Sequence, residues 1–546
     1  MSDAEALHES DSPTAPAPLS GPTYALSPAP VWYGVLAVIV CGLIEARYLN
    51  RGISLLDEGW AMYAAMQLHM GGTLYRDIFW VFPPAHVFTA WLGYAIAPDG
   101  ILFTRTLYGC WTVALCLSCF QLGRRIMPSR FALLGALLLA FAAPRTHTMQ
   151  LLFGYRYLVL AMLALLAFHY RLRTGDSRWM LVAGVMAGIA VSFRLTPGFA
   201  VSVGIGFGVM LATRDWRRWL GDWVRFGAGI SIVMLPVLAW FAYSVGLAQF
   251  AQEVVVHPLE MLQALPLPTL FFPRHWDRIL IGRAFYRFEF RLYSALYLMY
   301  GVALLITWLR CFRAGRPFPH AFLGSLVIFG AVFYIRSHGR ADEAHLDSTI
   351  PPICILLAHA SSTMFARLRS LPGLAARKFR HAATAFCGVV LCGWILLLSS
   401  DQKLINAYNG FERIDGLADA IYISPDEATM IARLTQTIAS ESQPGDVILD
   451  LSPSPFLYVL AQRRGPGYRD TVIPGTFYDA DDEEAFVKRL EATPPKLAIW
   501  PHKIFDDMQE RSLSTVAPRL VDWVRQNYEP VMRQERFSLL KYVGSD

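Results

Sequence analysis

Long apolar segments alternate with short polar ones through most of the chain and then stop near residue 399. Most of them have the roughly 17 to 25 residues that a helix needs to cross the hydrocarbon core of a bilayer. The segments lie near residues 31–49, 84–97, 103–123, 131–146, 151–170, 179–193, 196–212, 223–247, 291–309, 319–335, 350–365 and 382–399. This pattern predicts a mainly α polytopic membrane helix bundle over residues 31–399.

The pattern changes in residues 400–546, where shorter helical and strand-like runs alternate. Helices are predicted at 427–440, 456–462, 483–491 and 513–526, and strands at 447–451 and 497–500. The acidic run Asp479–Glu484 opens one of these helices, so its Asp-Ala-Asp triplet indicates helix-start charge and not a metal-nucleotide site. We therefore predict a C-terminal α/β domain.

The first thirty residues are rich in Ser, Pro and Ala and contain no Lys or Arg. They lack the basic region of a cleavable signal and cannot bury a core, so residues 1–30 are predicted to be a disordered cytoplasmic tail.

Composition supports a membrane protein: 55% of the residues are hydrophobic and 16% are charged, whereas soluble domains carry about 25% charge. The net charge of +6 is spread over short loops, which indicates orientation in a bilayer and not nucleic-acid binding. The eight cysteines lie in or beside apolar segments, as small core residues do, so neither a disulfide framework nor a zinc site is expected.

The arginines orient the bundle, because cytoplasmic loops collect Lys and Arg. Successive basic clusters are separated by two spans; they contain Arg124 and Arg125, Arg171 and Arg173, Arg214 and Arg217, Arg310 and Arg313, and Arg367 and Arg369. The segment 84–97 follows Pro83 and is short for a crossing, so we interpret it as an interfacial helix. About eleven crossings result, with the amino terminus inside and the C-terminal domain outside. No Asn-x-Ser/Thr sequon occurs, which favours a bacterial over a eukaryotic lumenal protein.

An acidic pair, Asp57 and Glu58, follows the first span and falls on the outer face in this topology. Asp57 is well placed to cap a helix that Gly71 and Gly72 would end. Alternatively, one carboxylate is a general base on an acceptor hydroxyl, since partial desolvation raises a carboxylate pKa toward a useful range.

A second group, Tyr75, Arg76 and Asp77, lies further along the same loop and precedes Phe82-Pro83-Pro84 and His86. Arg76 is a candidate for holding a phosphate. A surface ion pair between Arg76 and Asp77 is the alternative.

A third group lies between two late spans and mixes cations, acids and histidines. Its members are Arg336, His338, Arg340, Asp342, Glu343, His345 and Asp347. Ionisable groups at membrane depth usually have a functional or pairing role. Metal binding by His338, Asp342 and His345 is an alternative, but the intermixed arginines count against it.

A fourth group lies in the predicted outer loop 248–290, where arginines recur at i, i+4. Arg283 and Arg287 would share one face of a helix, as would Arg274 and Arg278. Such a helix either lies on the membrane and touches lipid phosphates or contacts the donor phosphate directly.

Several of these residues together resemble the GT-C glycosyltransferases, in the bacterial branch related to protein O-mannosyltransferases and the lipid A aminoarabinose transferase. The likeness rests on the Asp-Glu loop, Gly-Gly-x-Leu-Tyr-Arg-Asp at 71–77, Phe-Pro-Pro at 82–84, Arg105 opening a span, and Phe193-Arg194-Leu-Thr-Pro-Gly. It covers roughly residues 31–365. The chain departs from the aminoarabinose enzymes at Val81-Phe82, where those enzymes place Glu-Lys before the proline.

The resemblance implies a bacterial inner-membrane enzyme that moves a sugar from a polyprenyl-phosphate donor to an extracytoplasmic lipid, glycan or protein acceptor, with inversion and without an obligatory metal or other cofactor. Asp57 would be the base, with Glu58 beside it. Fixed cations would stabilise the leaving phosphate. The residues assigned to the donor phosphate are Arg76, Arg336, Arg340, Arg283 and Arg287. Those assigned to substrate binding are Tyr75, Asp77, His86, His338, Asp342 and His345.

Two other functions remain open on the sequence alone. A transporter or flippase of lipid-linked sugars would use the same cations but would need inverted repeats or broken spans, and the two halves of the chain do not match. A non-catalytic scaffold would bind a cell-envelope partner through the C-terminal domain.

Overall fold

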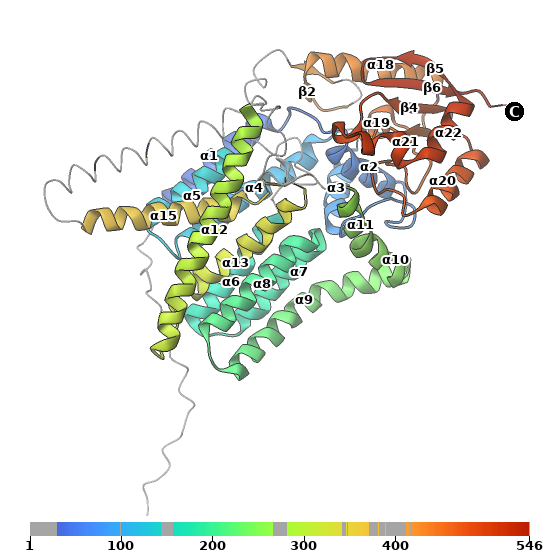
Figure 1. Ribbon diagram of the computed structural model, residues 1–546. Coiled ribbons are helices and arrows are strands. Elements are labelled where there is room, and N and C mark those ends of the chain that lie inside the picture. The colour runs from blue at the N-terminus through green and yellow to red at the C-terminus, as the bar shows by residue number, and fades with distance from the viewer. Residues whose placement is uncertain are drawn as a thin grey trace, which may run out of the picture.

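The computed structural model has a bundle of apolar helices with an α/β domain at one end (Figure 1). It describes residues 30–98, 100–142, 157–265, 281–340, 345–346, 348–370, 381, 388, 411–414 and 417–544. Some predictions lie outside the described residues. These are the N-terminal tail up to residue 29, the loop at 144–150, Arg274, Arg278, Asp342, Glu343, Asp347 and nearly all of the segment 382–399.

The bundle confirms the predicted succession of apolar helices. Its helices are α1 (Val31–Tyr48), α4 (Leu102–Gly123), α5 (Ser129–Ala142), α6 (Leu158–Thr174), α7 (Arg178–Phe193), α8 (Leu195–Ala212), α9 (Trp216–Ser244), α12 (Ile281–Arg313), α13 (Ala321–Ile335) and α15 (Ile350–Ser370). Helices α7 and α9 approach each other closely at Gly184, where an added Cβ would lie 2.0 Å from the Phe226 carbonyl oxygen. Glycine is therefore required at this crossing.

Within the described part of the chain, six helices are long and apolar enough to cross a membrane. Two shorter apolar helices, α5 and α7, accompany them, and the predicted total of eleven crossings stays a prediction. Helix α3 (Ala85–Ile96) has 12 residues. At about 1.5 Å per residue it is shorter than the hydrocarbon core, as the predicted interfacial helix should be.

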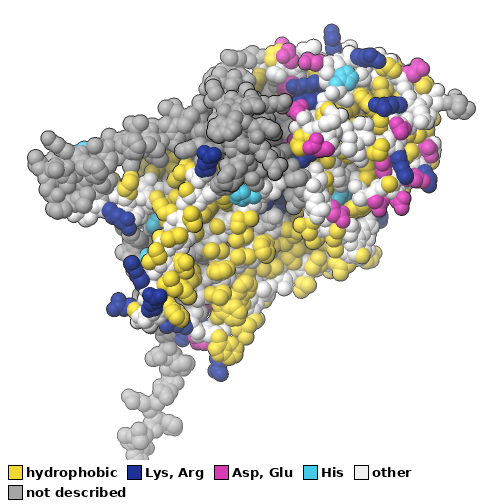
Figure 2. All heavy atoms as spheres, in the orientation of Figure 1, with side chains coloured by type: hydrophobic (Ala, Val, Ile, Leu, Met, Phe, Trp, Pro, Cys, Tyr) yellow, Lys and Arg dark blue, Asp and Glu magenta, His cyan; other side chains and the backbone are white. Residues whose placement is uncertain are grey.

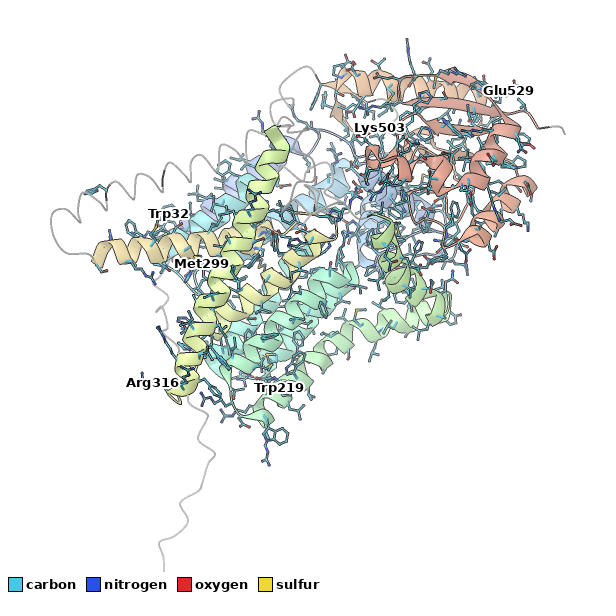
Figure 3. The ribbon with its side chains drawn as sticks, viewed as in Figure 1. Trp32, Trp219, Met299, Arg316, Lys503 and Glu529 are labelled. Carbon is cyan, nitrogen blue, oxygen red and sulfur yellow. The ribbon has the colours of Figure 1, made fainter. Side chains whose placement is uncertain are left out.

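The bundle surface is apolar, and Lys and Arg gather at its end away from the α/β domain (Figure 2). Arg316 and Trp219 mark that end in Figure 3. The orientation of the bundle in a membrane stays a prediction.

The long outer loop differs from its prediction. Residues 247–264 form α10 (Leu247–Ala251), a π-helical turn η3 (Gln252–Val256) and α11 (His257–Ala264). Arg283 and Arg287 belong to the first turns of α12, which continues unbroken to Arg313. The predicted arginine helix is therefore continuous with the next apolar helix.

The C-terminal domain contains a four-stranded sheet in the order β3-β4-β6-β5. Strands β3 (Ile448–Asp450) and β4 (Leu497–Pro501) are parallel, while β5 (Tyr528–Arg533) and β6 (Phe537–Tyr542) add antiparallel pairs. Its helices are α18 (Pro425–Glu441), α19 (Phe456–Ala461), α20 (Ala480–Ala492), α21 (Leu513–Val516) and α22 (Pro518–Asn527). Short turns η5 (Phe505–Asp507) and η6 (Gln509–Arg511) precede α21.

The predicted elements of this domain are confirmed, with two exceptions. The single helix expected over 513–526 is two helices, because Pro518 cannot continue the hydrogen-bond ladder of α21. Four strands were not predicted: β1 (Glu412–Arg413), β2 (Tyr422–Ile423), β5 and β6. Strand β5 lies at the sheet edge and carries Pro530 and exposed charges, which hide the apolar alternation of a strand.

The segment 50–102, the predicted first outer loop, lies between the bundle and the domain and carries α2 (Asp57–His69) and α3. Every side chain from Trp60 to Met66 is buried. Phe456 N–H donates to the Leu55 carbonyl over 3.1 Å, and Tyr63 stacks on Tyr458 with ring centroids 4.4 Å apart. Gly59 lies so close to α19 that a Cβ added to it would be 2.4 Å from Phe456 N. Helix α2 is therefore packed directly on the C-terminal domain.

The chain before α2 also pairs with the domain. Tyr422 in β2 (Tyr422–Ile423) donates its N–H to the Asn50 carbonyl over 2.9 Å and accepts from Gly52 N–H over 2.9 Å. Strand β1 (Glu412–Arg413) lies on the other side of β2. Hydrogen bonds thus fix the segment that leads from α1 to the acidic pair.

Candidate active site

Asp57 is the first residue of α2 and is partly exposed. The predicted capping role is wrong: Leu56 occupies the N-cap position, and its side chain makes no capping hydrogen bond. Instead, the Ser54 hydroxyl accepts from Asp57 N–H over 3.0 Å and lies 3.4 Å from Asp57 Oδ2. The predicted end of the helix is confirmed, since α2 ends at His69 and Gly71 has φ +91°. The Asp57 carboxylate is thus not used to cap its own helix.

Glu58 lies in a buried ion pair with Arg105 at the start of α4. Arg105 Nε donates to Oε1 and Nη2 to Oε2, both over 2.7 Å, and each side chain is at most 3% exposed. Such a fork-to-fork pair has fixed geometry as well as charge. Glu58 therefore holds the start of α2 against α4, and the two adjacent carboxylates have different surroundings.

Arg105 also binds the segment that precedes the acidic pair. Its Nη1 donates to the Leu49 carbonyl over 2.9 Å and its Nη2 to the Gly52 carbonyl over 2.8 Å. One buried guanidinium therefore connects the end of α1, the start of α2 and the start of α4. The sequence showed Arg105 only as a motif residue, because its partner lies 47 positions away.

Tyr75 and His86 are buried. Tyr75 has φ +69°, donates its hydroxyl to the Phe82 carbonyl over 2.6 Å and accepts from Gln249 Nε2 at its own carbonyl over 2.6 Å. His86 lies beside the Trp80 ring, with centroids 6.0 Å apart. These contacts shape the loop from within.

Arg76 and Asp77 form the surface pair that the sequence left as the alternative. Arg76 Nη2 lies 3.0 Å from Asp77 Oδ2, and the side chains are 56% and 46% exposed. Hydrogen bonding by the Arg76 guanidinium holds the pKa of Asp77 below its usual value. The Arg76 charge is thus already partnered on an open surface.

The described residues of the third group, which mixes cations, acids and histidines, make several separate contacts. Arg340 binds Asp506 of the C-terminal domain through both Nη atoms, each over 3.0 Å. Arg336 Nη1 reaches Ser348 Oγ over 3.5 Å, and the His338 ring lies edge-on to Phe290 with centroids 5.0 Å apart. The main chain of His345 accepts from Ser348 Oγ over 2.7 Å. Arg340 therefore attaches this group to the C-terminal domain.

A metal site at His338, Asp342 and His345 is the alternative for this group. In the part of the chain that the structure describes, no group of three His, Cys, Asp or Glu side chains is placed to hold a metal ion. Asp342 lies outside that part, so the alternative stays a prediction.

Known structures share this architecture over nearly the whole chain. ArnT from Cupriavidus metallidurans bound to undecaprenyl phosphate superposes with a TM-score of 0.52 at 14% identity, covering 94% of this chain and 98% of that one. The oligosaccharyltransferase AglB from Archaeoglobus fulgidus, in complex with an inhibitory peptide and a dolichol-phosphate, gives a TM-score of 0.53 at 14% identity, covering 94% and 74%. This is the GT-C fold.

Sequence comparison adds a local match to the GT-C likeness. Residues 82–240 match the family described as dolichyl-phosphate-mannose-protein mannosyltransferase. No curated protein matches the chain significantly. The resemblance proposed from the Asp-Glu loop is thus confirmed at the level of the GT-C superfamily, with ArnT-like and mannosyltransferase-like features.

Arg194 is a cation near the candidate site that the sequence showed only as part of a motif. It stands between α7 and α8, and its guanidinium lies 4.7 Å from the centroid of the Phe82 ring. Phe82 in turn contacts Trp60 of α2 edge-on, with centroids 6.1 Å apart. A chain of ring contacts therefore connects Arg194 to the helix that begins at Asp57. The signal in the sequence was an arginine between two apolar segments on the predicted outer side.

A buried polar cluster attaches the outer loop of this GT-C bundle to the domain. Glu253 in η3 accepts from the Tyr478 hydroxyl over 2.9 Å and lies 3.1 Å from His257 Nδ1. Arg469 Nη2 is 3.7 Å from the same carboxylate, and its guanidinium lies over the Tyr478 ring. These side chains come from both sides of the interface. The contact between bundle and domain is therefore polar and specific at this point.

Asp470 is an ionisable side chain at the interface with α2. It is buried and accepts from Gln67 Nε2 over 3.2 Å, and burial raises its pKa to about 7. Tyr63, Tyr458 and Asp450 are the titratable groups near it. Because the folded state holds the proton up to a higher pH than the unfolded chain does, stability is lost as the pH rises from about 4 toward 7.

We expect the thermal midpoint of the full-length protein to fall between pH 5.5 and pH 8.5, by a loss on the order of 2 kcal/mol. Asp470→Asn should flatten that dependence, whereas Asp446→Asn, at a partly exposed carboxylate paired with Lys496, should retain it. Equal slopes for wild type and Asp470→Asn in thermal unfolding would remove Asp470 as the cause.

Proposed function

We propose that the protein is a membrane glycosyltransferase that takes a sugar from a polyprenyl-phosphate donor and transfers it to an extracytoplasmic lipid, glycan or protein. The carrying observation is the position of Asp57 within a GT-C fold. It follows the first apolar helix, is partly exposed, and starts a helix fixed between bundle and domain. The ArnT and AglB structures named above contain lipid phosphates, which supports the donor class.

Asp57 acts as the general base in this proposal. The acceptor hydroxyl oxygen attacks the anomeric carbon, its proton passes to Asp57, and the bond to the phosphate breaks with both electrons leaving on the lipid phosphate. Attack from the face opposite the leaving group inverts the anomeric centre. Glu58, committed to Arg105, is a positioning residue that fixes the direction of the neighbouring carboxylate.

We add Arg194 to the cations that are proposed to bind the donor phosphate. Arg76 is paired with Asp77 and Arg340 with Asp506, so each would have to exchange a carboxylate for the phosphate. Arg194 contacts Phe82, the position where the related aminoarabinose enzymes place a lysine. Arg336 stays a candidate, as do Arg283 and Arg287, whose side chains are not described.

We expect Arg194→Gln to lower kcat for sugar transfer at least about a hundredfold, since a fixed cation at a leaving phosphate contributes mainly in the transition state. Arg217→Gln, at the opposite end of the bundle, is the matched control and should leave transfer unchanged. Single-turnover release of lipid phosphate measures both. Wild-type release by Arg194→Gln would remove it from the phosphate site.

The function itself is tested with purified protein in proteoliposomes and a panel of radiolabelled polyprenyl-phosphate sugars. We expect release of polyprenyl phosphate and a product of inverted anomeric configuration with at least one donor. Movement of intact lipid-linked sugar across the bilayer, without cleavage, would instead support the flippase alternative. We place the protein in a bacterial inner membrane, with the C-terminal domain outside and no cofactor required.

A further inference from the structure

A cavity of about 420 Å³ lies between the first outer loop and the C-terminal domain. Leu55 and Leu56, the two residues before Asp57, form one wall. The other walls are the segments that follow the parallel strands β3 and β4, together with α21. Crevices at the carboxyl ends of parallel strands are frequent ligand sites, and this volume is within the range of small-molecule pockets.

The loop that follows β3 forms one wall of the cavity, and its own hydrogen bonds hold its conformation. The buried Asp450 carboxylate accepts from Ser452 N–H over 2.8 Å and from Ser454 N–H over 2.7 Å, and it also binds the Ser452 hydroxyl. The backbone between these serines, at Pro453, lines the cavity. The loop therefore holds its shape without a ligand, which lowers the entropy cost of binding one.

The cavity is apolar with a cationic rim. Its charged lining residues are Lys503, Arg511, Arg536 and Asp506, which is three cations and one acid, a net charge of +2. Arg511 and Arg340 both pair with Asp506, and these two ion pairs fix the position of the Asp506 carboxylate in the cavity wall. Lys503 is 72% exposed and 3.9 Å from Asp507, and Arg536 is 53% exposed and 3.4 Å from Glu427. Figure 3 shows Lys503 on the side of the domain near the bundle, whereas Glu529 lies at the far edge.

We propose that this cavity binds the acceptor, and that it selects an acceptor with an anionic group on an apolar body. The inference rests on the proposed function. Apolar side chains would cover the body, while Lys503 and Arg536 would exchange the exposed carboxylates of Asp507 and Glu427 for the anion. Leu56, in the cavity wall, is the residue before Asp57. The C-terminal domain is then a specificity element that presents the acceptor hydroxyl to the base.

Binding to full-length protein in nanodiscs tests this directly, after the donor site has been saturated with undecaprenyl phosphate. The probe is 4-nitrophenyl phosphate, compared with neutral 4-nitrophenyl glucoside, by saturation-transfer NMR titration. We expect the phosphate to bind more tightly than the glucoside and to weaken as NaCl rises. Lys503→Glu should weaken phosphate binding at least about fivefold, whereas Lys488→Glu, another exposed lysine with an acid four residues away, should not.

A second pair of variants separates the cavity from general surface charge. Val516→Trp fills the cavity and should abolish binding of the probe, while Val531→Trp, on the exposed edge strand β5, should not. Unchanged binding by Val516→Trp, or equal affinity for phosphate and glucoside, would overturn the proposal. Because probe binding needs no turnover, the proposed transfer reaction can fail while this result stands, and the reverse is also true.

Discussion

Asp57→Asn is expected to lower kcat/KM for sugar transfer by about a thousandfold or more while the protein folds and binds donor as before. The amide keeps the size of the carboxylate and can still accept from Ser54, but it cannot take a proton from the acceptor hydroxyl. General-base catalysis contributes roughly 10² to 10⁴ in rate. Transfer from a radiolabelled polyprenyl-phosphate sugar and a donor-binding titration on the same preparation measure the two quantities separately.

Glu484→Gln is the matched control for this prediction. Glu484 is an exposed carboxylate of α20 and is paired with Lys488. Its loss should change transfer by less than about threefold, since exposed pairs contribute little. Wild-type turnover by Asp57→Asn would contradict the assignment of the base, and an equal loss in both variants would point to a general effect of removing a carboxylate.

Arg105→Met should have the largest effect on stability. It leaves the Glu58 carboxylate buried without its partner and removes the donors to the Leu49 and Gly52 carbonyls. Breaking one side of a buried ion pair typically costs 3 to 5 kcal/mol, about the same order as the whole stability of many domains. We expect a lower thermal midpoint in detergent and little folded protein in the membrane fraction.

The double variant Glu58→Met, Arg105→Met tests whether the pair itself causes the loss. Removing both charges removes the unpaired carboxylate, so the double variant should be more stable than Arg105→Met alone. Transfer activity should stay low, because Asp57 would no longer be held by its neighbour. Arg130→Met, at an exposed arginine near the start of α5, is the control and should keep both the midpoint and the activity. A double variant no more stable than Arg105→Met would mean that the carbonyl contacts dominate.

The fold was largely predictable because its strongest determinants are local. Apolar segments of membrane-spanning length set the bundle, and changes of period set the helices and the parallel strands of the C-terminal domain. The prediction failed where local pattern is weak. Strand β5 combines Pro530 with exposed charges, and Pro518 divides a helix whose apolar positions continue on both sides.

The sequence indicates where the candidate site lies, but it does not indicate which side chains pair with each other there. The Asp-Glu pair could be found because it follows the first apolar segment. The partner of Glu58 could not, since a contact across 47 residues depends on how α2 and α4 pack. The same holds for Arg340, whose partner Asp506 belongs to another domain. Arginines that appear free in a sequence are often neutralised by residues brought near only by the fold.

The contact at Gly59 has a mechanical consequence. Its backbone is pressed against Phe456 with no space for a side chain, and main-chain hydrogen bonds join the preceding segment to β2. Among the described residues, the segment that carries Asp57 is therefore joined to the C-terminal domain on both sides of that carboxylate. If Asp57 is the base that we propose, substrate would enter by motion of the surrounding loops and helices past this joined unit, and we expect the distance from Asp57 to the domain to stay constant during transfer.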